Sequence, residues 1–131
     1  MKWANKGHEF DDVYQNICQK KRFLLFGAGD YGHQFFPVMH EEIEIVGYID
    51  NNPHKVGTNI NGLRCMSLAD VKMLPDTGIV VTMSQIARIS AIGQLRSIGL
   101  EEGKDYFPME EFISVYYAYR YHKVYLSSIS F

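Results

Sequence analysis

The sequence of 131 residues predicts an α/β fold in which helices cover both faces of a mainly parallel sheet, giving three layers. Three observations lead to this prediction. Short apolar runs alternate with segments whose apolar residues recur at helical spacing. The run at 78–83 is apolar and β-branched for most of its length, which is typical of a strand buried on both faces. Finally, the first apolar run leads into a glycine-rich turn, and the second ends on an acidic residue.

The first half of the chain predicts two helices and two strands. Residues 8–20 have the apolar spacing of an amphipathic helix. A strand over 22–27, a helix starting near Asp30 and a second strand over 43–49 follow. Because Pro37 lacks a backbone donor, we expect that second helix to be kinked or short.

After two loops rich in asparagine and glycine, residues 63–66 predict a short extended piece. Ser67 then has the position of an N-cap, with Asp70 at the capping-box position, and we expect a helix from there to about Met73.

The buried strand over 78–83 precedes a helix that Ser84 caps and Gly99 ends. We expect the apolar side of this helix to face the sheet. It contains Ile86, Ile89, Ile92 or Gly93, and Leu95.

Tyr106 and Phe107 predict a last short strand, and Pro108 suits the first turn of a helix ending near His122. The chain closes on an apolar run at 124–131 that has the pattern of a strand. We therefore expect one domain over 1–131, with its core at 22–100. The region 108–131 would be a closing helix followed by the start of a further module, so the chain would be a piece of a longer protein.

Composition excludes several classes of partner. A net charge of −2 argues against nucleic acid, because binding a phosphate backbone requires a basic surface. No run approaches the ~20 apolar residues of a membrane span, and no signal peptide opens the chain. Cys18 and Cys65 lack metal-ligand spacing, so we interpret them as reduced thiols of a cytoplasmic protein.

The glycine-rich turn is the strongest functional signal. Gly27 allows a tight turn out of the strand, Gly29 lets a phosphate approach the backbone, and Gly32 lets the helix pack closely on the strand. Phosphates would meet free amides and the positive end of the helix dipole. The alternative is that these glycines serve only packing in a domain that binds nothing. Asp30 is interpreted as an N-cap that uses the same amides and weakens phosphate binding.

Asp50 lies 23 residues after Gly27, close to the spacing of about 20 expected for the ribose-binding acid of a dinucleotide site. Its carboxylate would accept hydrogen bonds from ribose hydroxyls and repel a 2′-phosphate, which favours NAD over NADP. The alternative is an aspartate that caps the following turn. Lys55 could reach a phosphate, or it could simply be a solvated loop lysine. Met83 and Ser84 should lie beside the crevice and could touch a base or ribose.

Three segments, in order, carry a family resemblance: G-A-G-D-Y-G at 27–32, I-V-G-Y-I-D-N-N-P at 45–53 and G-T-N-I-N-G at 57–62. They resemble the Rossmann-type domains at the front of polysaccharide-biosynthesis proteins, namely nucleotide-sugar dehydratases and epimerases and sialic-acid-type sugar acetyltransferases. Similar domains also precede radical-SAM modules, but the cysteine cluster of such a module is absent here.

The resemblance covers about 22–100 and implies a small Rossmann-like fold that holds NAD or a nucleotide sugar, with the chemistry often in another domain. It implies ligand contact at Gly27, Gly29, Gly32, Asp50 and Asn51. Together with the turn and strand-end arguments, the candidate ligand-binding residues are Gly27, Ala28, Gly29, Asp30, Tyr31, Gly32, Asp50, Asn51, Lys55, Met83 and Ser84.

Candidate catalysts are few. Tyr119 and Lys123 have the Tyr-x-x-x-Lys spacing of short-chain dehydrogenases, but they lie on the closing helix without the upstream serine of that family. The histidines lack metal-ligand spacing. We therefore predict a nucleotide-binding domain without complete catalytic machinery, working within a larger sugar- or nucleotide-processing enzyme. The alternatives are a small NAD-dependent oxidoreductase using Tyr119 and Lys123, and an interaction module that forms a homodimer or binds a joined domain through its aromatic last helix.

Overall fold

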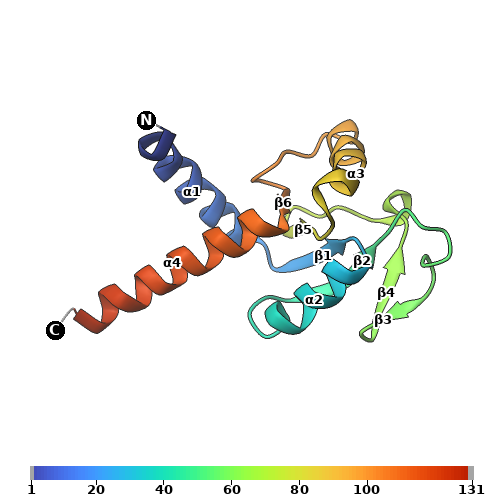
Figure 1. Ribbon diagram of the computed structural model, residues 1–131, viewed down its shortest axis with the longest axis horizontal. Helices are drawn as coiled ribbons and strands as arrows, with labels where there is room; N and C mark the ends of the chain where they lie inside the picture. Colours follow the sequence, from blue (N-terminus) through green and yellow to red (C-terminus); the bar gives the residue numbers. More distant parts are fainter. Residues whose placement is uncertain (1, 130–131) are drawn as a thin grey trace.

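A computed structural model of the chain describes the backbone of residues 2–129 and the side chains of residues 11–121 (Figure 1). In chain order its elements are α1 (Lys2–Gln19), β1 (Arg22–Phe26), α2 (Asp30–Met39), β2 (Ile45–Ile49), β3 (Asn59–Ile60), β4 (Leu63–Met66), the 3-10 turn η1 (Leu68–Asp70), β5 (Thr77–Val81), α3 (Gln85–Ser97), β6 (Tyr106–Pro108) and α4 (Met109–Ile129).

The sheet confirms the predicted class. Its six strands lie in the order β3-β4-β2-β1-β5-β6, and every pair is parallel except the β3–β4 hairpin. β1 is central, so Phe26 at its end lies opposite Ile49 of β2 and Val81 of β5. The chain moves from β1 to one side through β2 and returns to the other side at β5. That reversal places a crevice at the carboxyl ends of β1, β2 and β5.

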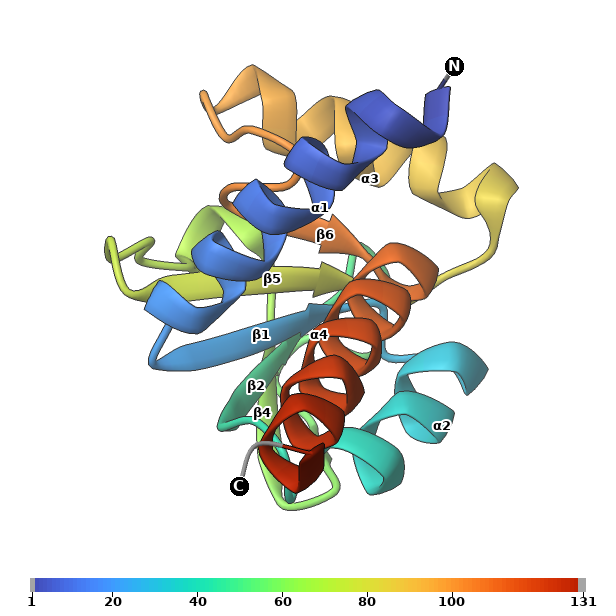
Figure 2. The same cartoon turned by 90° about the vertical axis from the view of Figure 1, so that its left-hand side faces the viewer.

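Helices cover both faces of the sheet (Figure 2). Alternate strand residues point to opposite faces, so Leu25 joins the core under α1, α2 and α4, while Leu24 and Phe26 join the core under α3. Phe112 of α4 is fully buried in the first core, and Leu95 of α3 is fully buried in the second. Each face is therefore closed by helices, of which α2 and α3 connect strands while α1 precedes the first strand and α4 follows the last.

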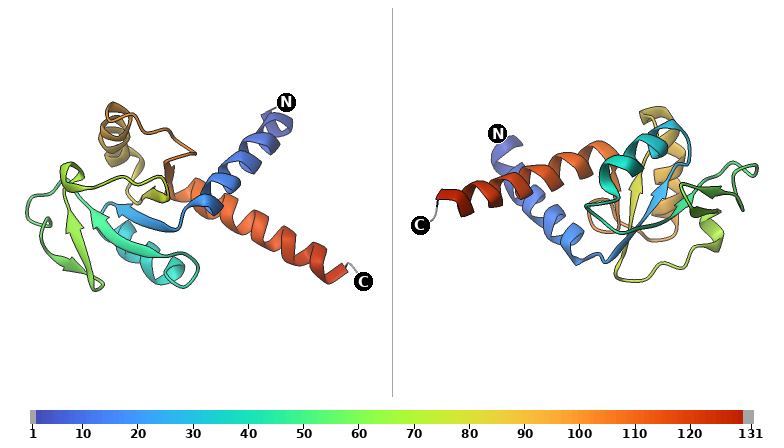
Figure 3. Two further views of the ribbon diagram at one scale, coloured as in Figure 1. Left: turned by 180° about the vertical axis from the view of Figure 1, so that it is seen from behind. Right: turned by 90° about the horizontal axis from the view of Figure 1, so that it is seen from below.

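α1 and α4 both extend past the sheet on the side that carries the chain ends (Figure 3). They meet where the ring of Tyr14 stacks on that of Tyr119 at 4.7 Å, and the Tyr119 hydroxyl donates to the Asp11 carboxylate. Arg120 pairs with Glu42, which ties α4 to the end of α2. Among the residues that the structure describes, no helix combines the length and apolarity that crossing a bilayer requires.

Two sequence expectations about helices were wrong. The helix expected after Ser67 is only the single turn η1, and the Ser67 hydroxyl donates to the Asp70 carboxylate (2.8 Å) instead of capping backbone amides. On α3, Leu95 is buried and Ile92 packs on the core as expected, but Ile86 and Ile89 are 85% and 72% exposed, and Ala91 is buried in their place. An apolar side chain does not by itself show which face of a helix meets the sheet.

The end of the chain also differs from expectation. The strand-like run at 124–131 is helical as far as Ile129, where α4 ends, and residues 130–131 lie outside the described part. No glycine or proline follows Pro108, so nothing in the sequence interrupts the helix. Pro108 itself closes β6 and precedes the helix. The remaining predicted elements are present, with small shifts at their ends except in α1, which begins at Lys2 and not at residue 8.

Candidate functional site

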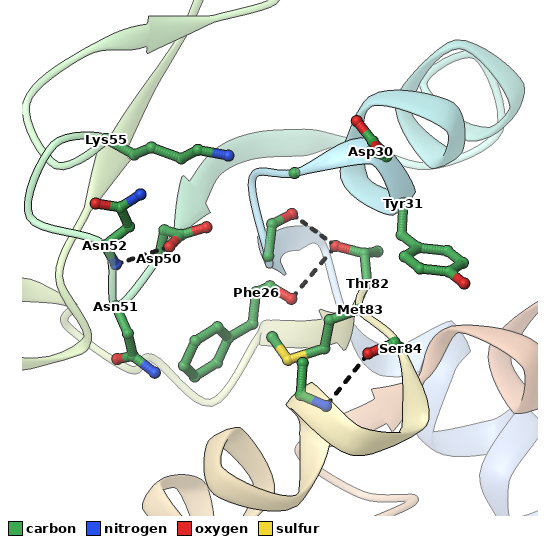
Figure 4. A pocket seen from close by; sticks show the side chains of 13 residues that line it. Phe26, Asp30, Tyr31, Asp50, Asn51, Asn52, Lys55, Thr82, Met83 and Ser84 are labelled. Carbon is green, nitrogen blue, oxygen red and sulfur yellow. Dashed lines mark hydrogen bonds between the residues drawn. The ribbon is translucent and has the colours of Figure 1, made fainter.

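A pocket of about 390 Å³ opens at the carboxyl ends of β1, β2 and β5, the crevice that the strand order creates (Figure 4). Its walls come from the segments that follow those three strands. The residues that line it are Phe26, Gly27, Gly29, Asp30, Tyr31, Asp50, Asn51, Asn52, Lys55, Thr82, Met83, Ser84 and Ala87.

The glycine turn between β1 and α2 has no room for a side chain at Gly27 or Gly32. Gly27 has φ +121°, and a Cβ there would lie 2.3 Å from the carbonyl oxygen of Thr82. A Cβ on Gly32 would lie 2.1 Å from the Gly27 oxygen, so α2 starts in direct contact with the turn. The Thr82 hydroxyl donates to that same oxygen at 2.9 Å. Two glycines and one threonine therefore fix the path of the turn.

The N-terminus of α2 opens onto the pocket without a side-chain cap. Its N-cap residue is Gly29, which has no side chain to accept from the first-turn amides. The interpretation of Asp30 as the N-cap was wrong, because the helix begins at Asp30 itself. Among the described residues no hydrogen bond joins its exposed carboxylate to those amides. The amides therefore remain available to a ligand, although the Asp30 charge stays at the pocket rim.

Asp50 binds backbone amides on both sides of the pocket wall. One carboxylate oxygen accepts from Ala28 N and the other from Asn52 N, each at 2.8 Å. The second bond confirms that Asp50 caps the following turn, while the first, to the glycine turn, was not expected. A carboxylate offers about four acceptor positions, so each oxygen retains one for a ribose hydroxyl. The turn-capping and ligand-binding roles of Asp50 are therefore compatible.

Lys55 reaches back over the glycine turn, as Figure 4 shows. Its Nζ donates to the Ala28 carbonyl at 3.0 Å and lies 3.8 Å from the position that a Cβ on Gly29 would take. The side chain is half-buried, and none of the ion pairs among the described side chains includes it. Asp50 and Lys55 thus hold the two polar groups of Ala28, and Lys55 brings a positive charge beside the open helix end.

Most candidate residues from the sequence meet in this pocket. Nine of the eleven line it; Ala28 and Gly32 are buried behind the surface. Sequence reasoning missed four lining residues: Phe26, Asn52, Thr82 and Ala87. Thr82 had a readable signal, because it is a buried hydroxyl at the end of an apolar strand and needs a hydrogen-bond acceptor.

The neighbouring thiol is not a nucleophile. Cys65 of β4 is fully buried, and burial raises the pKa of its thiol. The negative charge of Asp50 raises this pKa further, and the positive charge of Lys55 lowers it. The thiol therefore remains protonated at neutral pH.

The candidate oxidoreductase pair is not in the pocket. Tyr119 packs against α1, with its ring on Tyr14 and its hydroxyl on Asp11, and it does not line the cavity. The side chain of Lys123 lies outside the described residues. No group of three or more His, Cys, Asp or Glu side chains within the described part is arranged to hold a metal ion.

Comparisons with known proteins establish the family and the fold. The model of the C2185-like N-terminal family matches residues 19–104, and the chain belongs to this family. No curated protein matches the chain. Among solved structures, UDP-D-quinovosamine 4-dehydrogenase from Vibrio fischeri is similar with a TM-score of 0.51 and 22% identity, over 63% of this chain and 75% of that one. A structure of RSP in complex with β-NADH has a TM-score of 0.48 and 14% identity, over 83% of this chain and 63% of that one. The fold is thus Rossmann-like.

Proposed function

We propose that the chain is a nucleotide-binding domain whose ligand is NAD or a nucleotide sugar. The observation that carries the proposal is the convergence of three independent features on one pocket: the uncapped start of α2, the Asp50 carboxylate and the Lys55 ammonium. The helix start and Lys55 suit the phosphates of a nucleotide, and Asp50 suits its ribose. The name of the similar dehydrogenase, which refers to a UDP-sugar, agrees with this class of ligand.

The glycine turn and Lys55 would hold the phosphates. Free amides and the helix dipole stabilise an anion at the start of α2, and Gly29 lets it approach the backbone. An ammonium has three donors, so Lys55 can bind a phosphate oxygen while it keeps its bond to Ala28. The Asp30 carboxylate at the rim opposes this binding, which limits affinity for phosphate alone.

Asp50 would bind the ribose. Its two oxygens lie at the end of β2 with acceptor positions still unused, which suits the two hydroxyls of an unmodified ribose. A 2′-phosphate would place negative charge against the carboxylate. Lys55 is the one Lys or Arg among the lining residues, and it is bonded at the glycine turn. We therefore propose that NAD is preferred over NADP.

The domain would bind its ligand for chemistry performed elsewhere in a larger, cytoplasmic sugar- or nucleotide-processing enzyme. The lining residues include no histidine or cysteine, and the Asp50 and Lys55 side chains are already engaged with Ala28. α1 and α4, which extend past the sheet, are our proposed contact with a joined domain or a second copy.

Calorimetry with NAD, NADP, a UDP-sugar and S-adenosylmethionine tests the proposal. We expect NAD or the UDP-sugar to bind the wild-type chain, and Asp50→Ala to weaken binding of that ligand at least about tenfold, because it removes charged hydrogen bonds. Asp50→Ala should also reduce the preference for NAD over NADP. Asp12→Ala, which removes an exposed aspartate on α1, is the matched control and should bind as the wild type does. The proposal fails if neither NAD nor the UDP-sugar binds the wild-type chain.

A further inference from the structure

We infer that Asn51 and Gln94 together bind the edge of the nucleotide base, so that Gln94, which does not line the pocket itself, is a residue that determines base specificity. The inference rests on the proposed function and extends it to the part of the ligand that the glycine turn and Asp50 do not contact. It starts from a hydrogen bond of 2.9 Å between Asn51 Nδ2 and Gln94 Oε1.

The order of binding groups along the pocket places the base. The phosphate position lies at the start of α2, and the ribose position lies at Asp50 on the end of β2. A base attached to that ribose extends away from the phosphate. In that direction the wall continues with Asn51, the next residue, and the facing wall is the start of α3, where Ser84 and Ala87 line the pocket.

The floor of this end of the pocket is apolar. Figure 4 shows the side chains of Phe26 and Met83 between Asn51 and the start of α3. Phe26 is 1% exposed and Met83 is half-buried, so both are held in place by the core beneath α3. The polarisable thioether of Met83, backed by the buried Phe26 ring, forms a surface on which the flat face of a base packs well. The polar groups that could contact the edge of the base then come from the walls.

The Asn51–Gln94 hydrogen bond joins the Asn51 wall to the second half of α3 (Gln85–Ser97), beyond the first turn of the helix that lines the pocket. It leaves the Asn51 Oδ1 acceptor and the Gln94 Nε2 donors without partners among the described residues. An acceptor beside a donor complements the Watson–Crick edge of a base, for example N6–H and N1 of adenine or N3–H and O4 of uracil. The bond also fixes the distance between the two amides before the ligand arrives, which lowers the entropy cost of binding.

If the Asn51–Gln94 hydrogen bond had only a structural role, substitutions of Gln94 would affect ligand binding differently. The bond is exposed, so its net contribution to folding is small, about 1 kcal/mol or less. If its only role were to hold the loop, any side chain at position 94 that accepts from Asn51 would be equivalent. Gln94→Glu is that side chain: it keeps the acceptor for Asn51 Nδ2 and removes the Nε2 donors.

The test compares ligands with and without a base. Binding of ADP, UDP and ribose 5-phosphate is measured by NMR titration for the wild type, Gln94→Ala, Gln94→Glu and a control, Gln34→Ala, which removes an exposed glutamine on α2. We expect Gln94→Ala and Gln94→Glu each to weaken the tighter of ADP and UDP by about fivefold to tenfold relative to ribose 5-phosphate, as expected for a lost hydrogen bond. Ribose 5-phosphate corrects for the added charge of the glutamate, and the control should match the wild type.

Three results would overturn the inference while the proposed function stands: both Gln94 variants bind ADP and UDP as the wild type does, Gln94→Glu restores wild-type binding that Gln94→Ala loses, or binding of ribose 5-phosphate falls as much as binding of the nucleotide. If neither ADP nor UDP binds the wild-type chain although NAD or the UDP-sugar does, the inference fails alone. If none of these ligands binds, the proposed function fails, and the inference fails with it. The wild-type titrations alone distinguish these two cases from the other three.

Discussion

The turns after β1 and β5 have the same position in the fold, but the helices that follow them have different N-caps. Both follow buried parallel strands, both lie at the same edge of the sheet, and each starts a helix that faces the pocket. α3 begins with Ser84, whose hydroxyl accepts from Ala87 N at 3.2 Å. α2 begins with Gly29, which has no side-chain cap.

The difference separates a capped helix start, which serves stability, from an uncapped one, which we propose as the anion site. A serine N-cap satisfies an amide that would otherwise need water, and replacing such a cap with alanine typically costs about 1 kcal/mol. The glycine leaves the equivalent amides of α2 open, and the neighbouring Lys55 ammonium makes that end more positive. The less satisfied helix end is therefore the better anion site.

The largest expected loss of stability comes from a substitution that disrupts the close contact between the glycine turn and α2. Gly32→Ala would place a Cβ 2.1 Å from the Gly27 carbonyl, in a buried contact between two backbone segments. We expect a loss of about 3 kcal/mol in the free energy of unfolding, at the upper end of the usual cost of overpacking. Urea unfolding followed by circular dichroism measures it.

The control for this substitution is Gly93→Ala on α3, where the added Cβ meets no atom within 4 Å. Because alanine favours helix more than glycine does, we expect a gain of about 1 kcal/mol. A Gly32→Ala protein as stable as the wild type would mean that the turn is not held in this close contact.

An intermediate loss of stability is expected when the side-chain N-cap that α3 has and α2 lacks is removed. Ser84→Ala should lower the free energy of unfolding by about 1 kcal/mol, because Ala87 N loses its acceptor. Ser90→Ala, at an exposed position within the same helix, is the matched control and should change stability by less than about 0.5 kcal/mol. Equal unfolding midpoints for the two variants would show that the Ser84 cap contributes nothing.

The smallest expected effect on stability comes from Gly29→Ser, which gives α2 the same serine N-cap that α3 has. Gly29 has φ −91°, and a side chain there meets only Lys55 Nζ at 3.8 Å, so Gly29→Ser fits without strain. We expect a gain of a few tenths of a kcal/mol, the usual difference between serine and glycine at an N-cap. Nucleotide affinity should fall about tenfold, because the hydroxyl occupies an amide and the approach of the phosphate. Unchanged affinity by calorimetry would place the phosphate elsewhere.

Local patterns predicted much of this arrangement. The apolar strands, the glycine turn, the Ser84 cap and the acid after β2 depend on neighbouring residues in the chain, and each was found in place. The predictions were wrong where a side chain could make more than one kind of contact. Ser67 donated to Asp70 instead of capping a helix, and Ile86 and Ile89 faced away from the sheet.

The sequence by itself determined the class of the fold and most of the residues around the pocket, because strand periodicity and glycine spacing are local properties of the chain. Only the tertiary structure decided how those residues act together. It brought Asp50 and Lys55 to opposite polar groups of Ala28, and it brought Asn51 to Gln94, 43 positions further along the chain. Contacts between such distant residues depend on how strands align and helices pack, and no periodicity in the sequence records them.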